Sequence, residues 1–231
     1  MPIAHRGLHQ LAAGVPENSL AAFERACQAG FPIELDVRRT GDGHAAVIHD
    51  QDLRRLTGQP GMVAATPAGR LGSLRLLGTA ERVPLLEEVL RLVAGRVPVL
   101  VEVKNEGLPG RLEARVLEVL AGYDGRVALQ SFNPLSLRAF RRVAPAYPLG
   151  LLGGRLAGLD PARRFLLRNL LGAGVGRPRF IGYELQGLPC LPVTICRRLG
   201  LPVLAWTVRS EVERSRAERL ADNLIFEGFL P

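Results

Sequence analysis

Short apolar runs alternate with amphipathic stretches along the whole of this chain. The apolar runs are nearly continuous in hydrophobic residues, which is typical of strands buried on both faces. We predict strands over residues 2–4, 31–37, 45–48, 97–103, 127–129, 149–152, 180–182 and 201–206. Between them, apolar residues at helical spacing predict helices over residues 20–30, 85–93, 111–120, 135–143 and 211–220. Strands that alternate with helices indicate a parallel α/β fold.

The number and spacing of these strands predict a (β/α)8 TIM barrel that forms a single domain over residues 1–231. No shift in composition divides the chain into two parts. An open doubly wound sheet is the alternative, but such sheets usually carry a glycine-rich turn after the first strand. The turn at Arg6-Gly7-Leu8 has no GxGxxG pattern, so we rank the open sheet second. Residues 53–82 contain many glycines and are expected to form a loop-rich excursion.

Ionisable residues stand inside or directly after four of the predicted strands. Removing such groups from water is costly unless they meet counter-charges or a metal ion. Side chains two residues apart share one face of a strand, and the active site of a barrel lies at the carboxyl ends of its strands. We therefore expect a reaction centre where these residues converge. They are His5 and Arg6, Glu34 and Asp36, His49 and Asp50, and Glu102 and Lys104.

Lys104 is the only lysine among the 30 basic residues, since every other one is arginine. A compact ammonium at a strand end, in a chain that otherwise uses arginine, favours a point charge directed at an anion. The lysine could also be present by chance, paired with Glu102 or exposed at the strand end.

The basic character of the chain raises the question of a nucleic-acid or membrane partner. The formal net charge is +8 and the isoelectric point is near 10.5. However, the arginines are scattered in short pairs such as Arg54-Arg55, which solvated helix faces explain for the most part. Aromatic residues make up 5% of the chain and offer few platforms for base stacking, so we expect no nucleic-acid partner.

Cysteine usage and hydropathy predict a protein of a reducing, aqueous compartment. Cys27, Cys190 and Cys196 form no CxxC pair, which disfavours a disulfide framework and a zinc site. The first strand begins without a signal peptide, and no apolar stretch approaches the roughly 18 residues of a membrane span. We expect a cytoplasmic protein, although a mature form that had lost a leader would look the same.

The ordered motifs of this chain resemble those of the glycerophosphodiester phosphodiesterase family. The matching segments span nearly the full length. They are His5-Arg6-Gly7, Pro16-Glu17-Asn18-Ser19, Glu34-Leu35-Asp36-Val37, His49-Asp50, Thr57-Gly58, Pro84 to Val89, Glu102-Val103-Lys104, Ser131 to Pro134 and Trp206-Thr207-Val208. The resemblance implies a TIM-type barrel enzyme that uses a divalent metal to hydrolyse glycerophosphodiesters to glycerol 3-phosphate and an alcohol.

The resemblance also implies roles for individual residues. His5 and His49 would be the acid and base, Arg6 and Lys104 would bind the phosphate, and the metal ligands would be Glu34, Asp36 and Glu102. Trp206 would line the pocket against the glycerol carbons or fill the barrel mouth. Carboxylates without thiolates suit Mg²⁺ or Ca²⁺. Cations favour the charge that develops on the phosphate, and imidazoles with a pKa of about 6.5 exchange protons near neutrality.

Several interpretations remain open for these residues. The carboxylates could form salt bridges with Arg6 or Arg38 without any metal, which explains one carboxylate better than three. Glu17 and Asn18 could orient the site or only start a helix. The family implies attack by a glycerol hydroxyl and a cyclic phosphate, yet direct attack by water is equally compatible with the residues.

The chain departs from the family pattern at its end, where it reads Ile225-Phe226-Glu227-Gly228-Phe229. We therefore predict the last strand at Asn223–Phe226, and one of the earlier strands must be lost or merged. A compact excursion after His49 indicates a permissive pocket. Two functional alternatives follow: a lysophospholipase D activity with a lipid contact between Arg155 and Arg179, including Phe165-Leu166-Leu167, or a barrel that binds a phosphorylated ligand without turnover.

Overall fold

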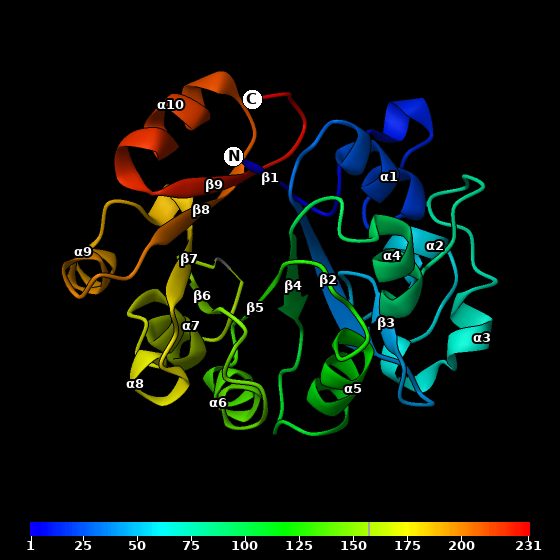
Figure 1. The fold of residues 1–231 in the computed structure, drawn as a ribbon, viewed down its shortest axis with the longest axis horizontal. Helices are drawn as coiled ribbons and strands as arrows, with labels where there is room; N and C mark the ends of the chain where they lie inside the picture. The colour runs from blue at the N-terminus through cyan, green and yellow to red at the C-terminus, as the bar shows by residue number, and fades with distance from the viewer. Residues whose placement is uncertain (157) are drawn as a thin grey trace. The chain divides into compact units, whose positions relative to one another are not determined.

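The computed structural model describes residues 1–156 and 158–231. It comprises two compact units, residues 4–127 and residues 128–231 together with 1–3, and each is described by itself below (Figure 1). That the chain is a single domain over residues 1–231 stays a prediction.

In the unit of residues 4–127, β2 (Ile33–Arg39) is the central strand. Ala4 of β1 (Ile3–Ala4) pairs in parallel with Ile33, and β4 (Val99–Val103) runs parallel to β2 on its other side. The helices α1 (Leu20–Gln28) and α5 (Arg111–Leu120) pack on β2, and α4 (Leu86–Val93) packs between these two helices. A short 3-10 helix, η1 (Leu11–Ala13), precedes α1. The central strand is thus covered by helices, as its continuous apolar sequence predicts.

The predicted strand 45–48 is not a barrel strand. It forms β3 (Ala45–Val47), which is antiparallel to β2 with Val47 opposite Val37. Only Thr40–His44 separate the two strands, and a connection this short can form a hairpin but not the crossover that a parallel pair requires. The loss of this strand is the reduction in strand number that the C-terminal sequence predicts.

The excursion of residues 53–82 is more ordered than expected. It contains α2 (Arg54–Thr57), the 3-10 helix η2 (Val63–Ala65) and α3 (Ala68–Leu71). Buried residues of these segments pack with β3 and the residues beside it into a cluster that we term the excursion core. Its members are Ala46, Ile48, Leu53, Leu56, Val63, Leu71, Leu74, Leu76 and Val83. Glycines between apolar residues therefore mark turns between short helices rather than an open loop.

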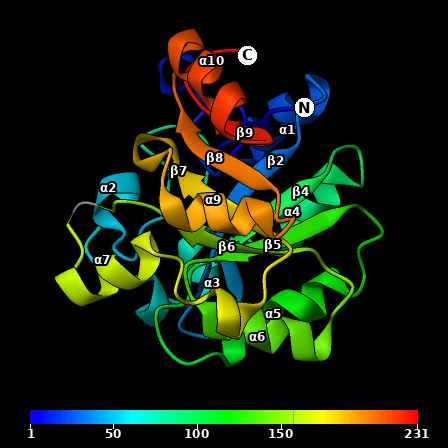
Figure 2. The same ribbon diagram turned by 90° about the vertical axis from the view of Figure 1, so that its left-hand side faces the viewer.

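The second unit continues the parallel series. The strands β5 (Val127–Ser131), β6 (Leu149–Gly153), β7 (Phe180–Glu184), β8 (Val203–Val208) and β9 (Asn223–Phe226) pair in this order. The bounds of β9 are those predicted for the last strand. The helices are α6 (Pro134–Val143), α7 (Pro161–Arg168), α8 (Ala173–Gly176), α9 (Leu191–Arg198) and α10 (Glu211–Leu220), with η3 (Leu185–Gly187) after β7 (Figure 2).

The order of elements is that of a (β/α)8 barrel, so the predicted fold class is confirmed. Within the described part of the chain, eight strands belong to the parallel series and β3 is an added hairpin strand. The helix α9 was not predicted. Its segment begins with Cys190-Leu191-Pro192, and proline is well tolerated in the first turn of a helix. The described residues contain no helix with the length and apolar character needed to cross a bilayer.

The backbone at Gly7, directly after Arg6, admits no side chain. Its φ is +79°, and a Cβ at this position would lie 2.9 Å from the backbone carbon of Ala22 in α1. Gly14 has a similar φ of +72° but an empty surrounding. Alanine at Gly14 would therefore face only the cost of a left-handed conformation, whereas alanine at Gly7 would also face the cost of close packing.

We expect Gly7→Ala to lower the free energy of unfolding by about 2–4 kcal/mol, against about 1 kcal/mol for Gly14→Ala. The difference is the cost of moving α1 away from β1. Urea unfolding of both variants measures it. Equal losses would contradict a role for close packing at Gly7.

Candidate active site

Three carboxylates meet on β2 and β4, with Glu34 and Asp36 inside β2 and Glu102 near the end of β4. The register of the two strands places Asp36 beside Glu102, and Glu34 lies on the same face of β2 as Asp36. Glu34, Asp36 and Glu102 each offer an oxygen, and these oxygens lie within 4.8 Å of one another. The exposed fractions are 1% for Glu34 and Asp36 and 8% for Glu102. The structure thus brings together all three predicted metal ligands.

Two cations offset part of this negative charge. Lys104 Nζ lies 2.5 Å from Glu102 Oε1 and 3.1 Å from Asp36 Oδ1. The guanidinium of Arg6 lies 3.2 Å from Asp36 Oδ2 through Nε, and the backbone amide of Arg6 donates to Glu34 Oε2 at 3.0 Å. Salt bridges therefore exist here, as the alternative interpretation supposed, but with Lys104 as well as Arg6.

The pKa shifts at the cluster follow from burial and from uneven pairing. Burial raises the pKa of Glu34 well above its usual range, and the charges of Asp36 and Glu102 add to the effect. Burial also acts to raise the pKa of Asp36, but the positive charges of Lys104 and Arg6 outweigh it, so this pKa is lowered. Burial alone would lower the pKa of Lys104, yet its two carboxylate partners raise it. The neighbouring cations therefore leave the negative charge of Glu34 insufficiently offset.

The residues fit a hard divalent cation. Their donor atoms are all carboxylate oxygens, which Mg²⁺ and Ca²⁺ prefer. Asp36 Oδ1 is shielded from solvent and accepts no hydrogen bond with good geometry from the described residues, although the Lys104 ammonium lies near it. A cation at the three oxygens would also stabilise the ionised form of Glu34. Glu34, Asp36 and Glu102 are therefore the residues that could hold a metal.

Asn18 fixes the orientation of Asp36. Its Nδ2 donates to Asp36 Oδ2 at 2.9 Å, and its Oδ1 accepts from the Asp36 backbone amide at 3.3 Å. The residue has a φ of +55°, a conformation that asparagine tolerates better than most residues, directly before Ser19 caps α1. Asn18 thus does more than start a helix.

We expect Asn18→Gly to weaken the binding of a divalent cation by about 10- to 100-fold, because glycine keeps the positive φ while removing both hydrogen bonds to Asp36. Isothermal titration of the chelator-treated protein with Mn²⁺ measures the change. A melting temperature close to wild type serves as the folding control, and unchanged affinity would show that Asp36 is oriented without Asn18.

Both predicted catalytic imidazoles lie in this unit. His5 Nε2 is 4.0 Å from Glu34 Oε2. His49 follows β3, where the amide of Ile48 donates to Asp36 O at 3.0 Å, so the hairpin brings His49 alongside the carboxylate strand. The ring of His49 is paired through Nδ1 with Asp50 Oδ1 at 2.7 Å, and Arg38 Nε donates to the His49 carbonyl. Burial lowers the pKa of His49, against the opposing charge of Asp36.

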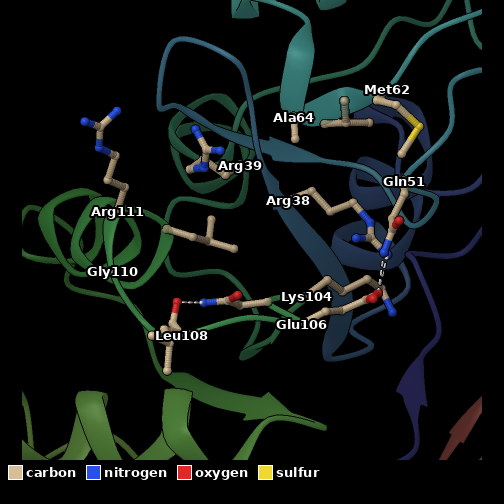
Figure 3. Close-up of a pocket in the computed structure, with 13 residues that line it drawn as sticks. Arg38, Arg39, Gln51, Met62, Ala64, Lys104, Glu106, Leu108, Gly110 and Arg111 are labelled. Carbon is tan, nitrogen blue, oxygen red and sulfur yellow. Dashed lines mark hydrogen bonds and ion pairs between the residues drawn. The ribbon is translucent and has the colours of Figure 1, made fainter.

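A pocket of about 400 Å³ adjoins Lys104 (Figure 3). Arg38 and Gln51 converge on Glu106 at one side of it, with Gln51 Nε2 2.5 Å from Glu106 Oε1. Apolar side chains of the excursion and of the segment before α5 contribute to its lining. They are Met62, Val63, Ala64, Leu108 and Leu112. The lining includes Lys104 but none of the three carboxylates.

Trp206 belongs to the other unit. It lies within β8 rather than at the end of a strand, and its ring packs edge-on against Phe132 with centroids 5.8 Å apart. Its Nε1 is shielded from solvent and has no hydrogen-bond partner among the described residues. A role for Trp206 in substrate binding stays a prediction.

Two further residues take part in the site: Glu17, which was expected either to orient the site or only to start a helix, and Arg55, which the sequence did not indicate. Glu17 receives Arg6 NH1 at 2.6 Å, and Arg55 contacts both Glu17 and Asp50. Glu17 lies in the Pro16-Ser19 motif, which is a usable sequence signal. Arg55 stands in an arginine pair of the kind expected on a solvated helix face, so its pattern carries no such signal.

Comparison with known proteins adds independent findings. The model of the glycerophosphoryl diester phosphodiesterase family matches residues 5–226. The chain belongs to this family. A glycerophosphodiester phosphodiesterase of Caldanaerobacter subterraneus subsp. tengcongensis is 37% identical, over 93% of this chain and 88% of the relative.

Solved structures of phosphodiesterases share the fold. One is an Oleispira antarctica phosphodiesterase in complex with its product sn-glycerol-3-phosphate, with a TM-score of 0.83 and 24% identity over 98% of this chain and 92% of that one. Another is a glycerophosphodiester phosphodiesterase of Thermotoga maritima, with a TM-score of 0.73 and 25% identity over 97% and 92%. The family resemblance predicted from the motifs is thus confirmed, and the protein is an enzyme of the phosphoric diester hydrolase class.

Proposed function

We propose that the protein hydrolyses small glycerophosphodiesters to glycerol 3-phosphate and an alcohol, with a divalent cation and histidine acid–base catalysis. The observation that carries the proposal is the buried cluster of three carboxylates, flanked by Arg6 and Lys104. A glycerophosphodiester brings one negative charge to two cations. The family membership and the pocket beside Lys104 support a small-molecule substrate.

Glu34, Asp36 and Glu102 would hold the cation, and Mg²⁺ or Ca²⁺ suits their oxygen atoms. When bound, the ion supplies Lewis-acid stabilisation of negative charge on the phosphate. The Lys104 ammonium, which lies beside Asp36 and Glu102, would bind a phosphate oxygen. Arg6 would bind a second oxygen, and its guanidinium is already held in place by Glu17 and Asp36.

The two imidazoles would move the protons of the reaction. The lowered pKa of His49 leaves its ring neutral near pH 7, so that it can accept a proton from an attacking hydroxyl group. His5 would then donate a proton to the departing alcohol oxygen. The attacking hydroxyl is that of the substrate glycerol or of water, and detection of a cyclic phosphate intermediate would distinguish them.

We expect chelator-treated protein to release no glycerol 3-phosphate from glycerophosphocholine or glycerophosphoethanolamine, and expect Mg²⁺, Ca²⁺ or Mn²⁺ to restore the release.

His49→Ala should lower kcat by at least about 100-fold at every metal concentration, because proton transfer is lost. Glu34→Gln should instead be partly rescued by excess metal, because it removes one ligand charge. Full activity without metal, or a normal rate for a folded His49→Ala protein, would contradict these roles.

Lysophospholipids are a second candidate substrate class, and one observation favours them. No residue of α7 is buried, and the side chains of Phe165 and Leu166 are 61% and 51% exposed. Residues 158–179 around them contain five arginines and one acidic residue, Asp160. An apolar surface with a basic surround suits an anionic lipid interface.

If lysophospholipids are substrates, Phe165→Ser combined with Leu166→Ser should lower turnover of micellar lysophosphatidylglycerol by about 10-fold and leave glycerophosphoethanolamine turnover unchanged. Leu191→Ser on α9 is a matched control, since Leu191 is 72% exposed. Equal effects of the two changes on micellar turnover would exclude a lipid contact specific to α7. Ligand binding without turnover of either substrate class would leave the non-catalytic barrel as the better interpretation.

A further inference from the structure

One guanidinium in the excursion joins two carboxylates of the site. Arg55 Nε donates to Asp50 Oδ2 at 2.5 Å, and NH2 donates to Asp50 Oδ1 at 3.0 Å. On its other side, NH1 and NH2 donate to Glu17 Oε2 and Oε1, each at 2.9 Å. All three nitrogens are therefore engaged, in two bidentate pairs. The planar guanidinium can form such pairs, whereas an ammonium cannot.

Each of these carboxylates also contacts a residue of the proposed mechanism. Asp50 Oδ1 lies 2.7 Å from His49 Nδ1, and Glu17 Oε1 accepts from Arg6 NH1 at 2.6 Å. An unbroken series of short polar contacts thus runs from His49 through Asp50, Arg55 and Glu17 to Arg6. The Arg55 side chain thus links His49, the proposed proton-transfer group, to Arg6, the proposed phosphate-binding group.

The backbone of Arg55 is fixed by the excursion core. Leu53, which precedes α2, and Leu56 within α2 are 2% and 1% exposed, and the amide of Leu77 donates to Leu56 O at 2.7 Å. The Arg55 side chain itself is 48% exposed. Single exposed ion pairs contribute little to stability, and a bidentate network contributes more. Stability does not explain, however, why both carboxylates of this network also contact His49 or Arg6.

We propose that Arg55 is a positioning residue: through Asp50 it fixes the tautomer and orientation of the His49 ring, and through Glu17 it fixes the Arg6 guanidinium. This inference rests on the proposed function, which assigns proton transfer to His49 and phosphate binding to Arg6. In this proposal, the excursion after β3 positions Arg55 beside Asp50 and Glu17.

The tautomer follows from the charge of Asp50. Burial acts to raise the pKa of Asp50, but the hydrogen bonds from Arg55 and His49 outweigh it and hold this pKa at about 2. At neutral pH the carboxylate is therefore ionised and can only accept hydrogen bonds. His49 Nδ1 then carries the ring proton, and Nε2 is left to exchange a proton with substrate. Without Arg55, Asp50 could turn away and both tautomers would be populated.

The test compares Arg55→Gln with Arg54→Gln. The two arginines are exposed neighbours in α2, so each substitution removes one positive charge from the same helix. The side chain of Arg54, however, takes part in none of the contacts described above. We expect kcat/KM on glycerophosphoethanolamine to fall by about 10- to 100-fold for Arg55→Gln and to stay within about twofold for Arg54→Gln. Arg55→Lys should restore little, because lysine cannot form both bidentate pairs. Melting temperatures show whether each variant is folded.

The second readout does not depend on turnover. In chelator-treated, ¹⁵N-histidine-labelled protein, the His49 nitrogens, assigned by comparison with His49→Asn, should show one tautomer with the proton on Nδ1. Arg55→Gln should shift them towards a mixture, and Arg54→Gln should not. An unchanged His49 spectrum in Arg55→Gln overturns the proposal, even if activity falls. A wild-type protein without turnover would refute the proposed function, whereas the spectral comparison would still decide on the role of Arg55.

Discussion

The mutual repulsion of three buried carboxylates is the constraint on which the rest of this structure depends. Glu34, Asp36 and Glu102 are held together by the register of two parallel strands, and no rotation of a side chain alone could separate them far in a buried site. Such a cluster persists only if cations approach it. Arg6 and Lys104 supply part of that charge, and the raised pKa of Glu34 reports the part that is missing. A divalent cation would supply it.

Segments far apart in the sequence support this cluster by different means. The close packing of Gly7 on α1 sets the position of Arg6, and Asn18 binds Asp36 from the start of the same helix. The hairpin of β2 and β3 brings His49 alongside Asp36. The excursion core then holds α2, from which Arg55 reaches Asp50 and Glu17. These supports act on different side chains, so the site is oriented from several sides at once.

The sequence predicted the parallel strands and the carboxylate cluster because both follow from local patterns. Apolar runs locate strands, and charges two residues apart share a face, so Glu34 and Asp36 could be placed without a structure. The apolar run at residues 45–48 looks the same in parallel and antiparallel sheets, so the prediction treated it as a barrel strand. The signal for a hairpin was the short gap after the strand predicted at residues 31–37, which is too short for a parallel crossover. Arg55 was missed for a related reason: its partners, Glu17 and Asp50, are defined by tertiary contacts, and an exposed arginine pair is the same in sequence whether or not it binds them.

The most direct test of the central claim is a crystal structure of the protein with Mn²⁺ and glycerol 3-phosphate, with the ion located by its anomalous scattering. The account predicts one anomalous peak bonded to oxygens of Glu34, Asp36 and Glu102, with Lys104 turned from the carboxylates to the phosphate and Arg6 on a second phosphate oxygen. A phosphate bound elsewhere, or a cluster that stays free of Mn²⁺ with Lys104 still paired to Glu102 and Asp36, would contradict it.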